Sequence, residues 1–202
     1  MKPQKKQTAP QPKAKSKPIE ANGKLQLTLG IIAAAFAFIL YANTLGHEYA
    51  LDDFPTIYGN KITMSGFKGI PTLMHTAYWY GLDGKNDWLY RPLSMIMFAA
   101  EWQLTGGKPW LGHLINVLLY ALTAFVLFNL LKKLFYKYNI LLPWAITLIW
   151  VAHPIHTEVV ANIKSRDEIL AMLFSVLTMQ QVLNYTKGGN VINLILTAVY
   201  YF

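Results

Sequence analysis

The sequence contains no cysteine, which excludes disulfide bonds and thiolate metal sites. It is also poor in charge, because only 14% of its 202 residues are charged, whereas about 25% is usual for a soluble domain. Hydrophobic residues make up 54% of the chain. This composition excludes an ordinary soluble domain and predicts an all-α protein, a polytopic membrane helix bundle.

Acidic residues are scarce, since ten Asp and Glu face eighteen Lys and Arg and leave a net charge of +8. The positive excess lies mostly in residues 1–24, which hold seven Lys and one Glu and carry +6 of that charge. No basic face runs through the rest of the chain, so we expect no nucleic-acid partner. Residues 1–24 lack aromatic side chains and cannot bury enough apolar surface to fold, so we expect a disordered cytoplasmic tail near anionic lipid.

Long apolar stretches predict the spanning helices, because a helix needs about 20 apolar residues to cross the hydrocarbon core. The stretches cover residues 25–45, 112–131, 134–152 and 168–185, and another begins at 191. The first is long for a secretory signal peptide and lacks a clear cleavage site, so we expect a retained anchor with a cytoplasmic amino terminus. The last apolar run is too short to span, so we expect a truncated sequence, the amino-terminal part of a longer membrane domain.

The segment between the first two spans, residues 47–111, has mixed character. Within it, residues 92–104 are apolar but would reach only about 20 Å as a helix, so we expect a juxtamembrane helix along the interface. The following span then delivers Lys132, Lys133 and Lys137 to the cytoplasm, as the positive-inside rule prefers. The polar clusters at residues 52–53 and 153–158 consequently share the outer side.

Two adjacent carboxylates, Asp52 and Asp53, stand just beyond the first span and have no basic neighbour in sequence. Carboxylates beside a membrane are costly to desolvate, so their presence indicates a functional site. We interpret Asp52 as a general base that removes a proton from an incoming hydroxyl, with Asp53 as a supporting residue. The alternative for Asp53 is a helix cap ahead of Phe54 and Pro55.

Two arginines are candidate binding residues. Arg91 opens the expected juxtamembrane helix and could hold a phosphate through its planar fork, although an interfacial Arg that extends its head group into water is an equal alternative. Arg166 lies at the amino end of the helix that contains the apolar stretch 168–185, where a cation opposes the helix dipole. We therefore expect an anionic ligand to balance Arg166.

His153, His156 and Glu158 have the side chains of metal ligands. Pro154 between the two histidines disrupts the helical spacing of a zinc site, and no third strong ligand lies nearby. We therefore assign no metal site, keep a divalent cation as an open alternative, and expect these residues to hydrogen-bond a substrate phosphate or sugar.

Several ordered motifs together resemble the transmembrane and tetratricopeptide-repeat-containing O-mannosyltransferase family, and more broadly the GT-C type of glycosyltransferase. The motifs are Tyr41-Ala42-Asn43-Thr44, Leu51-Asp52-Asp53-Phe54, Tyr90-Arg91-Pro92-Leu93, His113-x-x-Asn116, His153-Pro154-Ile155-His156-Thr157-Glu158 and Ser165-Arg166-Asp167-Glu168-Ile169-Leu170. The resemblance runs from about Tyr41 to Leu170, and no tetratricopeptide repeat is present.

The resemblance implies a multi-pass enzyme of the bacterial inner membrane or endoplasmic reticulum, acting on the periplasmic or lumenal side. It would transfer a mannose-like sugar from a polyprenyl-phosphate donor to a protein or glycan hydroxyl. An acidic residue in the first outer loop serves as base in this family, which matches Asp52. The competing interpretations are a multi-pass transporter, a non-catalytic membrane scaffold, or a ligase or polymerase that uses a lipid-linked sugar.

Overall fold

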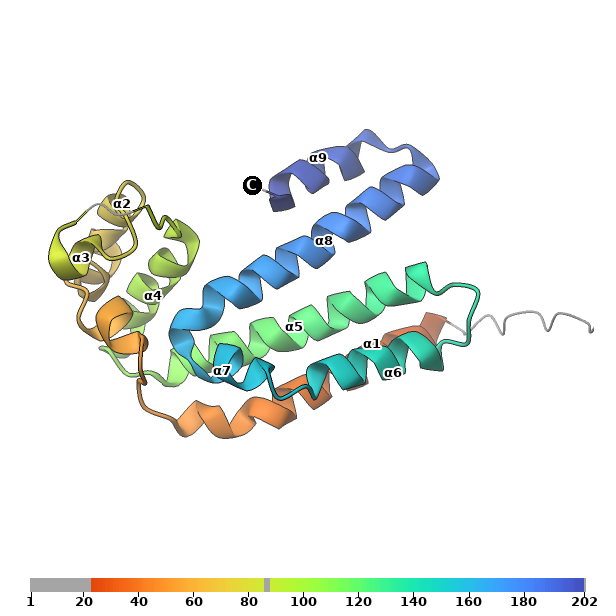
Figure 1. Cartoon of the computed structure of the whole chain (residues 1–202), viewed down its shortest axis with the longest axis horizontal. Helices are drawn as coiled ribbons and strands as arrows, with labels where there is room; N and C mark the ends of the chain where they lie inside the picture. Colours follow the sequence, from red (N-terminus) through yellow and green to blue (C-terminus); the bar gives the residue numbers. More distant parts are fainter. Residues whose placement is uncertain (1–22, 86–87, 202) are drawn as a thin grey trace, which may run out of the picture.

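The computed structural model describes residues 23–85 and 88–201 and contains helices but no strand across that range. Three long helices, α1 (Gly23–Tyr41), α5 (Trp110–Leu134) and α8 (Arg166–Gly188), run lengthwise through the molecule. The shorter α6 (Leu141–Val151) and α9 (Val191–Tyr201) lie beside them (Figure 1). The predicted all-α bundle is confirmed, while residues 1–22 of the predicted tail lie outside the described residues.

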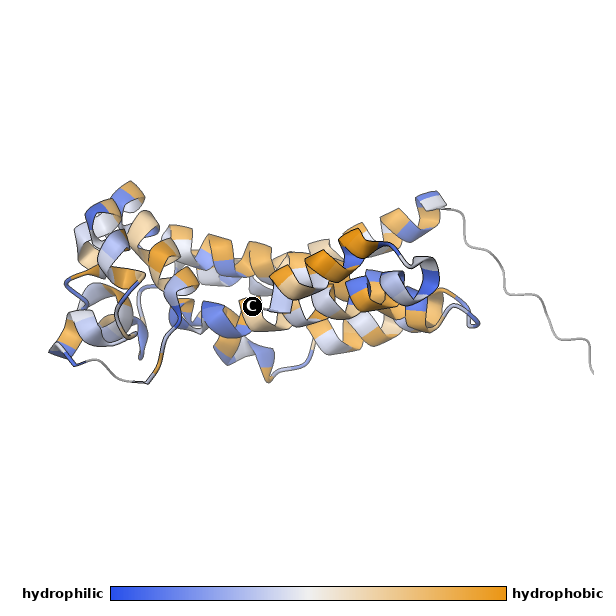
Figure 2. Ribbon diagram, turned by 90° about the horizontal axis from the view of Figure 1, so that it is seen from above, coloured by the Kyte–Doolittle hydropathy of each residue, from blue (hydrophilic) through white to orange (hydrophobic). Residues whose placement is uncertain are grey.

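Three segments of the described chain are long and apolar enough to cross a membrane. They are Gly23–Gly46, Trp110–Leu134 and Ile163–Gly188, the first of which joins α1 to the 3-10 turn η1 (Ala42–Gly46). The 25 residues of α5 correspond to about 37 Å of helix. Hydrophobic residues cover much of the bundle in Figure 2. The chain is therefore a membrane protein, as its composition predicts.

The helix that we expected over residues 134–152 is shorter than predicted. Only the 11 residues of α6 are helical, and residues 135–140 form a turn. Pro143 lies in the first turn of α6, where the missing N–H costs nothing because the first N–H groups of a helix have no partner within it. At this length, α6 is too short to cross the hydrocarbon core alone.

Short helices gather at one end of the bundle, which we call the cap end (Figure 1). They are η2 (Phe54–Tyr58), η3 (Thr63–Gly69), α2 (Ile70–Leu73), α3 (Tyr80–Asp83), α4 (Pro92–Thr105), α7 (His156–Ala161) and η4 (Ile163–Ser165). The helix that we expected over residues 92–104 corresponds to α4. The opposite end, where α5 and α8 finish, is the far end.

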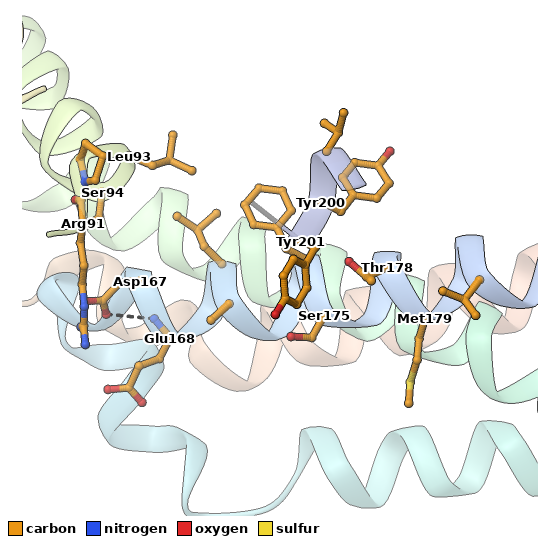
Figure 3. Close-up of a pocket in the computed structure, with 16 residues that line it drawn as sticks. Arg91, Leu93, Ser94, Asp167, Glu168, Ser175, Thr178, Met179, Tyr200 and Tyr201 are labelled. Atoms are coloured by element: carbon orange, nitrogen blue, oxygen red, sulfur yellow. Dashed lines mark hydrogen bonds and ion pairs between the residues drawn. The ribbon is translucent and has the colours of Figure 1, made fainter. Parts of the chain in front are cut away.

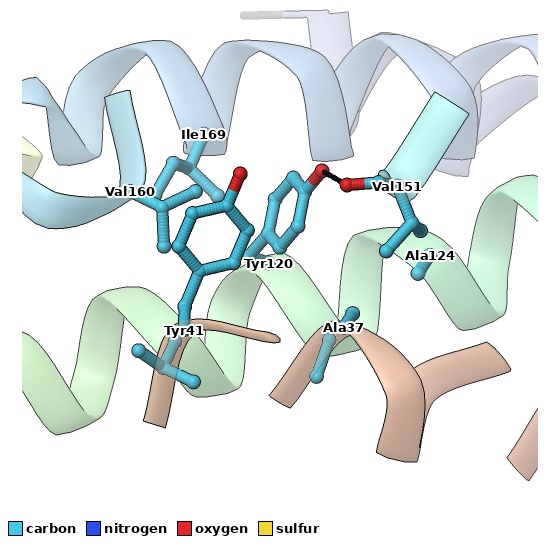
Figure 4. Close-up of a cluster of buried hydrophobic side chains, with 9 residues drawn as sticks. Ala37, Tyr41, Tyr120, Ala124, Val151, Val160 and Ile169 are labelled. Carbon is cyan, nitrogen blue, oxygen red and sulfur yellow. Dashed lines mark hydrogen bonds between the residues drawn. The ribbon is translucent and has the colours of Figure 1, made fainter. Parts of the chain in front are cut away.

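Small and aromatic residues hold α1 against α5. The buried small side chains are Ala37, Ala121 and Ala124, which let the two backbones approach closely. Gly30 lies so near α5 that an added Cβ would stand 2.8 Å from a ring carbon of Phe125. The Tyr120 hydroxyl donates a hydrogen bond of 2.9 Å to the Val151 carbonyl, which joins α5 to the end of α6 (Figure 4). The three helices thus form one packed unit that supports the cap end.

Candidate functional site

Asp53 is fully buried at the cap end. Its Oδ2 accepts a 3.1 Å hydrogen bond from the backbone N–H of Ala50, and its Oδ1 accepts one of 2.7 Å from the backbone N–H of Lys164 in η4. Burial raises the pKa of Asp53, while these backbone donors act in the opposite direction. Although Asp53 stands at the start of η2, its side chain makes no capping hydrogen bond there. It instead ties the first cap loop to the segment before α8.

Asp52 has the opposite environment, since its side chain is 61% exposed. The residue before it, Leu51, has a φ of 45°, the single positive φ of a non-glycine residue in the described part of the chain. A left-handed backbone costs a non-glycine residue energy and persists where the surroundings impose it. The strained turn at Leu51 therefore leads first into an exposed carboxylate, Asp52, and then into a buried one, Asp53.

Lys164 joins the two carboxylates, and sequence analysis did not single it out. Its backbone N–H binds Asp53, and its Nζ lies 3.9 Å from Oδ2 of Asp52. The Asn162 side chain accepts a second hydrogen bond, of 3.2 Å, from the same backbone N–H. In the sequence, the one signal is a lysine two positions before the apolar α8. The structure thus supplies a cationic neighbour for Asp52 from a distant part of the sequence.

Arg166 is fully buried and does not line an open site. Its guanidinium forms an ion pair with Glu101 of α4 and lies 4.7 Å from the ring centre of Phe98. The Nε donates to Oδ1 of Asn116 at 2.8 Å, and Nη2 donates to the Gly112 carbonyl at 3.1 Å. The anion that we expected to balance Arg166 is therefore Glu101 of the chain itself, and the pair fastens α4 to α5 and α8.

Asn116 completes this network on α5. Its side-chain amide donates a 3.0 Å hydrogen bond to the Asn162 carbonyl, so one side chain holds both Arg166 and the segment that carries Lys164. His113, one turn earlier, is buried against His47 at 6.1 Å between ring centres. Two polar residues three positions apart in an apolar helix are the sequence signal for such a network.

Arg91 lies at the start of α4, and its side chain is 39% exposed. It forms an ion pair with Asp167 in the first turn of α8, and Figure 3 shows the two side chains together at one end of a groove of about 880 Å³. The polar end of this groove holds Ser94 and Glu168 as well. Its remaining wall runs along α8 and α9 and is mostly apolar, with Leu170, Ala171, Phe174, Met179, Val182 and Val199. Arg91 therefore stands where a polar end meets a long apolar wall.

His153, His156 and Glu158 lie around the turn into α7 and make no hydrogen bond or ion pair with Asp52 or Asp53 in the described structure. The two imidazole centres are 6.1 Å apart. The His156 ring packs 4.6 Å from that of Trp150, and this burial lowers its pKa, as does the neighbouring His153. Within the described residues, no three His, Cys, Asp or Glu side chains are grouped to hold a metal ion.

Comparison with known proteins finds related sequences. The chain is 32% identical over 148 residues to the protein O-mannosyl-transferase TMTC1 of Mus musculus, which covers 72% of this chain and 16% of that protein. It is 30% identical over 154 residues to TMTC2 of Homo sapiens and 29% identical over 162 residues to tmtc2 of Xenopus laevis, each covering 74% of this chain and 18% of the relative. No protein-family model and no solved structure matches the chain. The chain spans less than a fifth of the length of these relatives.

Proposed function

Because the chain belongs to the protein O-mannosyl-transferase family, we propose that it forms part of a GT-C type membrane glycosyltransferase. This enzyme moves a mannose-like sugar from a polyprenyl-phosphate donor to a protein hydroxyl group, on Ser or Thr. The observation that carries the proposal is the pair of unlike carboxylates at the cap end, with Asp53 buried and Asp52 exposed.

Asp52 acts as the general base in this proposal. A base must reach the hydroxyl that it deprotonates, and Asp52 is the exposed member of the pair. Asp53 holds the loop through Ala50 and Lys164, which limits the positions that Asp52 can adopt. The ammonium of Lys164, at 3.9 Å, fixes Asp52 further and adds positive charge beside the donor phosphate.

The proposed reaction is one inverting displacement. The acceptor hydroxyl loses its proton to Asp52 as its oxygen forms a bond to the anomeric carbon, and the bond from that carbon to the phosphate oxygen breaks on the opposite face. The leaving lipid phosphate keeps the bonding electron pair and needs no dedicated acid. It needs nearby positive charge as its own negative charge develops.

Arg91 supplies that charge in the proposal. Its guanidinium is partly exposed, and one ion pair with Asp167 orients it while leaving other N–H groups for a phosphate. The adjoining groove has a polar end and an apolar wall, which suits a phosphate linked to an isoprenoid chain. His153, His156 and Glu158 are the proposed sugar contacts, since they lie in or just before α7 at the cap end of the bundle (Figure 1).

The proposal gives the protein several passes through the bilayer, with the cap end periplasmic or lumenal and the far end cytoplasmic. The far end carries Lys132 and Lys133 at the end of α5 and Lys187 at the end of α8. The positive-inside rule places such lysines in the cytoplasm.

The test is sugar transfer from a polyprenyl-phosphate donor in membranes that contain the full-length protein. Asp52→Asn is expected to lower kcat by about 100-fold or more while donor binding persists, because general-base catalysis is worth that much. Asp53→Asn is expected to lower both the transfer activity and the yield of folded protein, because Asp53 holds the cap loop in place. Asp83→Asn is the matched control, since Asp83 is another cap-end carboxylate with a lysine neighbour, Lys85, at 4.0 Å.

Full transfer by the Asp52 variant would refute the base assignment. Absence of transfer from wild-type protein with every polyprenyl-phosphate sugar tested would refute the enzyme class and favour a transporter or a scaffold. Activity that disappears on chelation and returns with a divalent cation would show that the cation, rather than Arg91 and Lys164 alone, supports the leaving phosphate.

A further inference from the structure

Charge is separated along the length of the bundle. Every carboxylate side chain in the described residues belongs to the cap end or to the first turn of α8 next to it: Glu48, Asp52, Asp53, Asp83, Glu101, Glu158, Asp167 and Glu168. The far end carries cations at the ends of α5 and α8 and in the turn after α5. These cations, Lys132, Lys133, Lys137 and Lys187, form what we call the lysine cluster.

The cluster converges on one exposed aromatic ring. The Nζ atoms of Lys137 and Lys187 lie 5.5 and 5.6 Å from the ring centre of Tyr136, which brings the turn after α5 together with the end of α8. Lys133 donates a 2.9 Å hydrogen bond to Asn184 of α8. These contacts hold ammonium groups from two membrane helices at one place.

No carboxylate neutralises this cluster within the described structure, where the ion pairs all lie at the cap end. The carboxyl ends of α5 and α8 offer a partial negative charge of about half an elementary charge each, which accounts for a lysine in each last turn. Four ammonium groups exceed that compensation. The remaining positive charge therefore attracts anions from the surroundings.

The surroundings of the cluster indicate which anion. Leu134, Tyr136 and Tyr138 are all exposed beside the lysines, with 46%, 63% and 61% of their surface accessible. Tyrosines at the end of a spanning helix are typical of the headgroup region of a bilayer, and an exposed leucine there faces acyl chains. An anion with an attached hydrocarbon chain fits these neighbours better than a freely soluble one.

We propose that the lysine cluster binds the phosphate groups of anionic glycerophospholipids in the leaflet at the far end. The apolar rim contacts the first part of the acyl chains, and the ammonium groups of α5 and α8 share the headgroup. This site is independent of sugar transfer, and it lies at the opposite end of the bundle from Asp52.

The experiment reconstitutes the full protein in phosphatidylcholine vesicles with a trace of spin-labelled lipid. Electron paramagnetic resonance then compares the protein-bound fraction of labelled phosphatidylglycerol with that of labelled phosphatidylcholine. We expect phosphatidylglycerol to be preferred about fivefold in wild-type protein, the effect of about one basic residue near the surface. Changing all four lysines of the cluster to Gln should abolish this preference.

The matched control changes four exposed cap-end lysines, Lys61, Lys68, Lys85 and Lys108, to Gln, which removes the same net charge. This variant should retain the preference for phosphatidylglycerol. A second variant, with all four lysines of the cluster changed to Arg, keeps the positive charge and should also retain the preference, which shows that substitution at these positions does not by itself disrupt the fold. An equal loss in the cap-end variant, a loss in the Arg variant, or no preference in wild-type protein would overturn the proposal. Displacement of the labelled lipid by inorganic phosphate, but not by chloride at equal ionic strength, would instead identify a site for a soluble anion.

Discussion

The buried ion pair between Arg166 and Glu101 offers the sharpest test of how the cap end is attached to the bundle. Glu101→Leu leaves the guanidinium of Arg166 without a counter-charge in a position with no solvent access. Removing one partner of such a pair costs about 3–5 kcal/mol, because a buried charge stays behind. We therefore expect Glu101→Leu to destabilise the protein by about that amount.

The double variant Glu101→Leu with Arg166→Met removes both charges and should be more stable than Glu101→Leu alone. Replacing a buried pair by apolar side chains is often neutral or stabilising. Here Oδ1 of Asn116 and the Gly112 carbonyl would each lose a donor, and an unsatisfied buried acceptor costs about 1–3 kcal/mol. We expect the double variant to remain less stable than wild type, with a positive coupling between the two sites.

The assay is equilibrium unfolding in mixed micelles of increasing sodium dodecyl sulfate content, followed by circular dichroism, on wild type, both single variants and the double variant. Phe98→Leu serves as a control, because it removes the ring beside Arg166 and leaves the charges in place. Single variants that unfold at the wild-type midpoint would refute the burial of the pair. Costs that simply add in the double variant would refute the direct coupling between Arg166 and Glu101.

Further predictions concern the helix contact, pH and topology. Gly30→Leu should destabilise the α1 and α5 contact by about 1–3 kcal/mol, measured in the same unfolding assay, because its side chain would overlap Phe125. Since burial lowers the pKa of His156, the unfolded state binds more protons near and below its ordinary pKa of about 6.5, so stability should fall as pH drops through that range and His156→Gln should flatten the profile. The chain has no cysteine, so Ser65→Cys and Tyr138→Cys report topology directly, and an impermeant maleimide should label them from opposite sides of the membrane.

Much of the fold could be predicted because apolar length and charge act locally. The run that ends at Lys132 and Lys133 predicted α5 to within a few residues at each end. The apolar stretch that opens at Pro92 likewise corresponds to α4. The start of α6 was misplaced because Leu134 and the aromatic residues after it extend the apolar pattern into a turn, and hydropathy alone does not show where a backbone stops being helical.

The candidate site could be predicted only as a set of residues, because its contacts join distant parts of the chain. Asp52 has no basic neighbour in sequence, but in the folded chain the Nζ of Lys164, from a distant segment, lies 3.9 Å from its Oδ2. The cation at the start of α8 predicts an anionic ligand, yet its partner is Glu101, 65 positions earlier. A residue type indicates that a charge needs a partner, and only the packing of α4, α5 and α8 determines which one it has.

The unlike environments of Asp52 and Asp53 follow from this same packing. Asn116 holds the segment that carries Lys164, and the backbone of Lys164 holds the carboxylate of Asp53, so α5 positions the first cap loop through two side chains. With Asp53 fixed inside, the strained turn at Leu51 leaves Asp52 at the surface. Asn116→Ala should therefore displace Asp52 indirectly, through the Lys164 segment and Asp53. In the transfer assay this variant should lower kcat more than donor affinity. An unchanged kcat in that variant would mean that the loop holds Asp52 in place without support from α5.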